Sequence, residues 1–149
     1  MAEFHPQKEI PGDVMLEEHK ALRNNWINKY LLRGQSNYAG ASPAGNPKTL
    51  LKKNVTLLPL DGGNDVYGGF QHDADYFSKG ASGALGAFFN TKVTSYDKQL
   101  IQGAKTIMSN AINKDVYIAA RNMKIFFQIA VEYKTHLTNY DYYRGCYGF

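Results

Sequence analysis

Two segments in the C-terminal half of the chain carry apolar residues at the three- and four-residue spacing of an amphipathic helix. We predict helices over roughly 96–113 and 115–135. Between residues 115 and 135, three isoleucines fall outside the main apolar stripe, at positions 118, 125 and 129. The second helix is therefore expected to pack on more than one side.

An earlier helix is predicted over roughly 14–33. Its apolar stripe is Met15, His19, Leu22, Trp26 and Tyr30. Asp13 is placed to cap its start, and Gly34 to end it in the left-handed conformation that helix C-termini favour. A further short helix over 82–90 is rich in glycine and alanine, which allow close approach of a neighbour.

The remaining segments lack helical periodicity. They are an N-terminal arm (1–12), a Gly- and Pro-rich arm (34–73) and a Tyr-rich tail (136–149). A long irregular segment inside a compact domain is usually functional or held in place by something else. We therefore predict a single, mainly α domain over 1–149, a bundle of about four helices with irregular arms.

Composition narrows the class of protein. The chain has 149 residues, of which 44% are hydrophobic, enough for a core. It has no apolar run long enough to span a membrane. One cysteine and no secretory pattern indicate an intracellular protein of a compartment that the sequence does not fix. The net charge of +4 is dispersed, so no strong nucleic-acid signal is present.

Two short motifs raise the possibility of ester hydrolysis. "GQSN" (34–37) and "GGND" (62–65) resemble blocks I and III of the SGNH (GDSL-like) hydrolase superfamily. The resemblance implies an α/β fold, with Ser36 as nucleophile and with Gly62 or Gly63, together with Asn64, as oxyanion-hole residues. The base of that family comes from a D-x-x-H block, and no such block occurs here. The alternative for "GQSN" is a helix stop at Gly34 followed by a loop.

Acidic residues and a histidine between positions 61 and 75 have neither EF-hand nor zinc-site spacing. We therefore expect no metal, no cofactor and no small-molecule substrate.

The leading hypothesis is a non-catalytic structural or interaction subunit of a larger protein assembly. The chain has 11 tyrosines and 8 phenylalanines, side chains that are enriched at interfaces. A mitochondrial complex, a ciliary or microtubule lattice, and a virion or filament are the candidate assemblies. The predicted partners are other protein subunits. The predicted contact residues are Trp26, Tyr30, Phe126, Phe127, Tyr140, Tyr142, Tyr143 and Tyr147.

Overall fold

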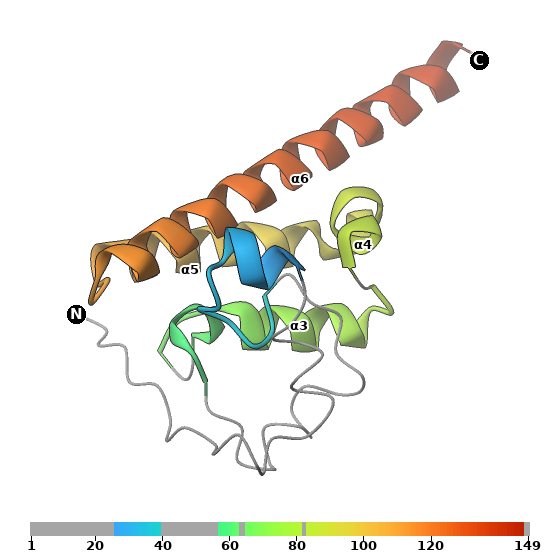
Figure 1. Cartoon of the computed structure of the whole chain (residues 1–149). Coiled ribbons are helices and arrows are strands. Elements are labelled where there is room, and N and C mark those ends of the chain that lie inside the picture. Colours follow the sequence, from blue (N-terminus) through green and yellow to red (C-terminus); the bar gives the residue numbers. More distant parts are fainter. Residues whose placement is uncertain (1–25, 40–56, 63–64, 82, 148–149) are drawn as a thin grey trace.

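The computed structural model of the chain describes residues 26–39, 57–62, 65–81 and 83–147 (Figure 1). Its elements are helices or helical turns, and no strand occurs in these ranges. In chain order they are η2 (Ile27–Leu31), η3 (Pro59–Asp61), α3 (Gly69–Ser78), α4 (Gly83–Phe89), η4 (Thr91–Val93), α5 (Thr94–Ser109) and α6 (Lys114–Tyr147). The mainly helical prediction is confirmed. The predicted N-terminal arm (1–12) and residues 14–25 of the first predicted helix lie outside the described ranges.

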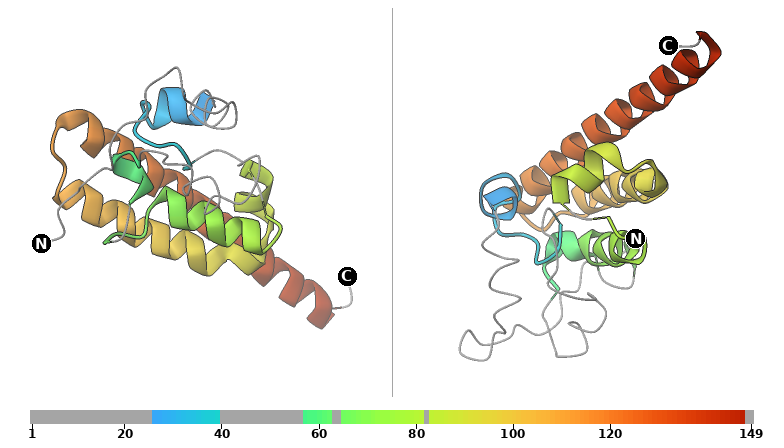
Figure 2. Two further views of the ribbon diagram at one scale, coloured as in Figure 1. Left: turned by 90° about the horizontal axis from the view of Figure 1, so that it is seen from below. Right: turned by 90° about the vertical axis from the view of Figure 1, so that its right-hand side faces the viewer.

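The helices α5 and α6 form an antiparallel pair that makes up most of the core (Figures 1 and 2). The Asn113 side chain accepts a hydrogen bond of 2.9 Å from the Val116 amide and so caps the start of α6. The inner faces supply the buried side chains Leu100, Ala104, Ile107, Val116, Ala119, Ala120, Met123, Phe127 and Ala130. The alanines let the two helices approach closely.

The helix α6 is longer than its sequence pattern predicted. It has 34 residues and ends at Tyr147, so the expectation of an irregular tail from residue 136 is wrong up to that point. Tyr133, Tyr140, Tyr143 and Tyr147 are spaced by seven, three and four residues, so these positions continue one helix face. The C-terminal turns of α6 project beyond α3, α4 and α5, as both views in Figure 2 show.

The helix α3 begins inside the segment that was predicted to be irregular (34–73), which corrects the end of that arm. Asp73 lies within this helix and is buried. The preceding chain lies directly on α5, where a methyl group at position 103 would be 1.7 Å from the carbonyl oxygen of Tyr67. Gly103 is therefore required for this close approach.

The described part of the first predicted helix is a π-helical turn, η2, which ends at Leu31, slightly before the predicted end at residue 33. Arg33 and Gly34 both adopt left-handed conformations, with φ of 54° and 72°. The Gly34 amide donates to the Asn28 carbonyl at 2.8 Å. A helical turn, and not a strand, therefore runs into the "GQSN" motif.

Within the described ranges, none of the helices combines the length and the hydropathy that a membrane span requires.

Candidate functional site

Ser36 lies in the loop after η2 and is fully buried. Its hydroxyl donates to Asp61 Oδ1 at 2.7 Å. The Ser36 Oγ atom also accepts from the amides of Tyr38 and Ala39, at 3.0 and 2.7 Å. The hydroxyl therefore has its donor and two acceptor positions in use, and it ties the 36–39 loop to η3.

Asp61, the acceptor of the Ser36 hydrogen bond, makes further contacts with the backbone. Its carboxylate also accepts from the amides of Asn37 at 2.9 Å and Leu58 at 2.7 Å. Burial raises the pKa of Asp61 to about 6, although the hydrogen bonds from Ser36 and the backbone amides act to lower it. A carboxylate that closes two loops through backbone amides stabilises local structure.

The second hydrolase-like motif has a structural explanation in its glycine. Gly62 has φ of 93°, and a Cβ there would lie 2.4 Å from the Val66 carbonyl oxygen. Only glycine fits this turn. Asn64, the other oxyanion-hole candidate, lies outside the described residues.

The resemblance to ester hydrolases therefore rests on two motifs whose described residues hold turns together. The helical fold differs from the α/β fold that the resemblance implies. The Ser36 hydroxyl donates to a carboxylate, whereas a nucleophilic serine donates to a base such as histidine.

A buried polar cluster joins α3, α5 and α6. Asp97 Oδ1, on α5, is 2.7 Å from His72 Nε2, and the same carboxylate accepts from the Tyr76 hydroxyl and from the Lys134 ammonium group. Lys134 is 1% exposed, and Asp97 has no exposed surface. Burial lowers the pKa of His72, against the raising effect of Asp97. The cluster holds its charges inside the core, which suits a structural tie between three helices.

Two charged residues of this cluster could have been recognised in the sequence, because they occupy core-facing positions of the predicted helices. Asp97 precedes Leu100 and Ala104 on the inner face of α5, and Lys134 follows Phe127 and Ala130 on that of α6. Opposite charges at core-facing positions of two neighbouring helices indicate a buried pair.

A third buried carboxyl, that of Asp73, has fewer hydrogen-bond partners. Asp73 Oδ2 and the Tyr38 hydroxyl are both buried and make no hydrogen bond with the described residues. Burial, and then the charge of Asp61, raise the pKa of Asp73 well above its usual range. Within the described ranges, no group of three His, Cys, Asp or Glu side chains is placed to hold a metal ion.

The outer face of α6 carries exposed apolar side chains. Ile125 is 44% exposed and Ile129 is 53% exposed, and the exposed Tyr133 follows one turn later. Ile118 lies on the same face two turns before Ile125, and is half-buried. We call these four residues the outer stripe. It lies on the other side of α6 from the inner face, which packs on α5.

Two other elements border the outer stripe. Near its start, the Asn122 side chain donates to the carbonyl of Leu31, the last residue of η2, at 2.7 Å. Near its end, the ring of Phe89 in α4 contacts the ring of Tyr133, with centroids 5.8 Å apart. Leu31 and Phe89 are both exposed, so they extend the apolar surface at opposite ends.

The predicted contact residues are distributed unevenly. Trp26 and Tyr30 are exposed on the η2 turn, whereas Phe126 is half-buried between Phe88 and Phe127. Phe127 is only 4% exposed and stacks edge-on against His72, with centroids 4.8 Å apart. Its assignment as a contact residue is corrected, because it belongs to the core. The backbone of α6 includes positions 140, 142, 143 and 147, whose side chains lie outside the described part of the structure.

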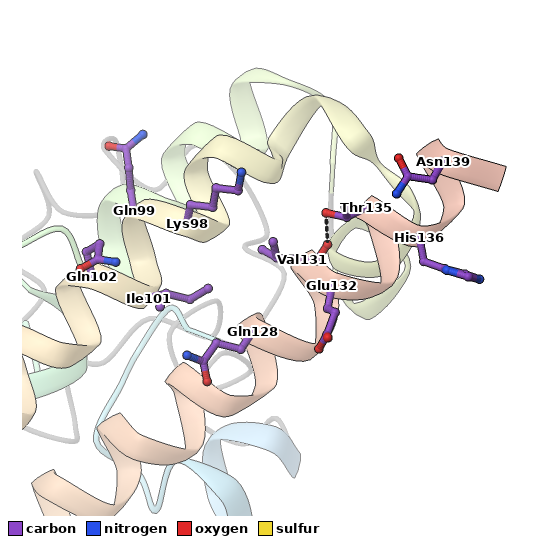
Figure 3. A pocket seen from close by; sticks show the side chains of 10 residues that line it. All are labelled: Lys98, Gln99, Ile101, Gln102, Gln128, Val131, Glu132, Thr135, His136 and Asn139. Carbon is purple, nitrogen blue, oxygen red and sulfur yellow. Dashed lines mark hydrogen bonds between the residues drawn. The ribbon is translucent and has the colours of Figure 1, made fainter. Parts of the chain in front are cut away.

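An open groove of about 910 Å³ lies along the surface where residues 98–102 of α5 meet residues 128–139 of α6. Figure 3 shows Ile101 and Val131 between the two helices, with polar side chains around them. The polar residues are Lys98, Gln99, Gln102, Gln128, Glu132, Thr135, His136 and Asn139. The groove is wide and open to solvent, which distinguishes it from the enclosed pockets that bind small molecules.

No protein-family model matches the chain, and no similar curated protein or solved structure was found.

Proposed function

We propose that this protein is a non-catalytic structural subunit that binds another protein chain through the outer face of α6. The observation that carries the proposal is the exposure of Ile125 and Ile129 on a helix whose opposite face is already packed in the core. A helix with apolar residues on two sides is expected to be covered on both.

The projection of α6 supports this proposal. Isolated helical turns are marginally stable in water, and most helices gain stability from packing. The outer stripe continues in register through Tyr140, Tyr143 and Tyr147 on the projecting turns (Figure 1). Tyrosine presents a large apolar area with a polar tip, which suits a protein interface.

The buried polar groups favour a structural role over catalysis. Ser36, Asp61 and Asp97 each use their polar atoms in contacts within the fold. Catalytic groups need access to a substrate, and these side chains are buried.

The partners in this proposal are protein subunits of an intracellular assembly, since a single cysteine is typical of a reducing compartment. A mitochondrial complex, a ciliary or microtubule lattice, and a virion or filament remain the candidate settings.

The test is the mass of the native particle, measured by light scattering after gel filtration of gently lysed source cells. We expect a particle heavier than the 16.7 kDa chain. Ile125→Asp with Ile129→Asp should release the chain at its monomer mass. The matched control is Ile112→Asp, because Ile112 is 69% exposed but lies in the turn before α6. A monomer mass for the wild-type chain would contradict the proposal.

A further inference from the structure

We infer that the partner on the outer face of α6 is a second copy of this chain, packed antiparallel with its own α6 against the first. This inference rests on the proposed function and names its partner. It is drawn from three pairs of residues, two on α6 and one beside it. The midpoint of each pair along the helix lies close to position 127.

The first pair is apolar. Ile125 and Ile129 are the most exposed isoleucines of the outer stripe, and they lie one turn apart. A twofold axis between them places Ile125 of one copy opposite Ile129 of the other, and the reverse. Ile118 then faces the exposed His136 of the second copy. Such an isologous contact covers both exposed isoleucines of each chain at once.

The second pair is charged. Arg121 and Glu132 are both exposed, and their separation of about three turns puts them on the same flank of the stripe. An antiparallel twofold keeps the same flank of the two helices together, so Arg121 of each copy lies level with Glu132 of the other. A parallel pair would put these flanks on opposite sides of the interface. The charges therefore select the antiparallel direction.

The third pair borders the stripe on its other flank. Leu31 is anchored at the level of Asn122 by the hydrogen bond to its carbonyl, and Phe89 is anchored at the level of Tyr133 by ring contact. Asn122 and Tyr133 are again about three turns apart. The same twofold brings the exposed Phe89 of one copy to the exposed Leu31 of the other. Apolar, charged and bordering residues thus agree on a single register.

The experiment uses the purified full-length chain and two charge variants, with mass measured by sedimentation equilibrium. We expect the wild type to dimerise. Arg121→Glu gives each copy two acidic residues at these positions, and Glu132→Arg gives two basic ones. Each variant alone should dimerise roughly tenfold more weakly, and their equimolar mixture should recover the wild-type affinity as a heterodimer.

The control is Lys105→Glu, which makes the same charge change at an exposed position on α5 and should leave the dimer intact. Circular dichroism checks that every variant keeps its helical content. A dimer whose affinity the mixture does not restore would overturn the antiparallel register. A wild-type chain that stays monomeric at all concentrations would overturn the second copy as partner. The native-particle mass would still test the proposed function separately, through the release of the chain by the isoleucine substitutions.

Discussion

The ammonium group of Lys134 binds the carboxylate of Asp97, and both side chains are buried between α5 and α6. This pair lies beneath the turns of α6 that carry the end of the outer stripe. Tyr133 and His136 flank Lys134 in sequence, but they are on the exposed side of the helix. The pair therefore holds in place the part of α6 that the proposed interface uses.

Lys134→Met should destabilise the fold by about 3–5 kcal/mol, because it leaves the buried Asp97 carboxylate without its cationic partner. Urea unfolding measures the loss. Arg33→Met is the matched control, since it breaks the exposed ion pair of Arg33 with Asp115, 2.8 Å apart. Such a pair contributes about 0–1 kcal/mol. Equal losses in the two variants would contradict a structural role for the buried pair.

Asp73→Asn should stabilise the fold at neutral pH by roughly 1 kcal/mol. The reason is that an amide has no proton to lose, whereas ionisation of the buried Asp73 carboxyl, whose Oδ2 has no partner among the described residues, is unfavourable in the fold. The pKa of Asp73 is raised in the folded state. The folded wild type therefore holds this proton more tightly than the unfolded chain does, and its stability falls as pH rises through the raised pKa.

The advantage of Asp73→Asn should therefore be largest at neutral pH and shrink as pH falls from the raised pKa towards 3.8. Urea unfolding of both proteins at a series of pH values measures it. An advantage that grows towards low pH would show that Asp73 is charged and stabilising in the fold.

Ser36→Ala should destabilise the fold by about 1–3 kcal/mol, because the Tyr38 and Ala39 amides and Asp61 each lose a buried hydrogen-bond partner. Thermal unfolding measures the loss. In parallel, a small chromogenic acetyl ester should be hydrolysed no faster by the wild type than by the variant. A folded Ser36→Ala variant that alone lacks hydrolysis would favour the ester-hydrolase hypothesis.

The helical class and the two sides of α6 could be predicted from the sequence, because both depend on local periodicity. The spacing of the isoleucines at 118, 125 and 129 is enough to place them outside the inner stripe, without knowledge of which residues surround them in space. The left-handed conformation of Gly34, just after η2, was predictable for the same reason, since helix termination is a local property.

The buried polar clusters could not be predicted in this way. His72 and Asp73 fall at the end of the segment predicted to be irregular, and both are buried. Their neighbours are distant in sequence: Asp97 and Phe127 lie against His72, and Asp61 lies near Asp73. The pattern of apolar residues did not predict the helix beyond residue 135, because tyrosines occupy the stripe positions there. Phe127 was assigned to an interface by its residue type, whereas its spacing places it on the inner face of α6, where it is buried.

The most direct test of the proposed docking face is the reactivity of a thiol placed on it. In a Cys146→Ser background, Ile129→Cys and Ile112→Cys would be labelled with a maleimide in the native particle and again after denaturation. Both positions are exposed in the single chain, so a partner on α6 should protect position 129 and leave position 112 reactive. Denaturation should make the two labelling rates equal. Equal and fast labelling of both thiols in the native particle would contradict the account.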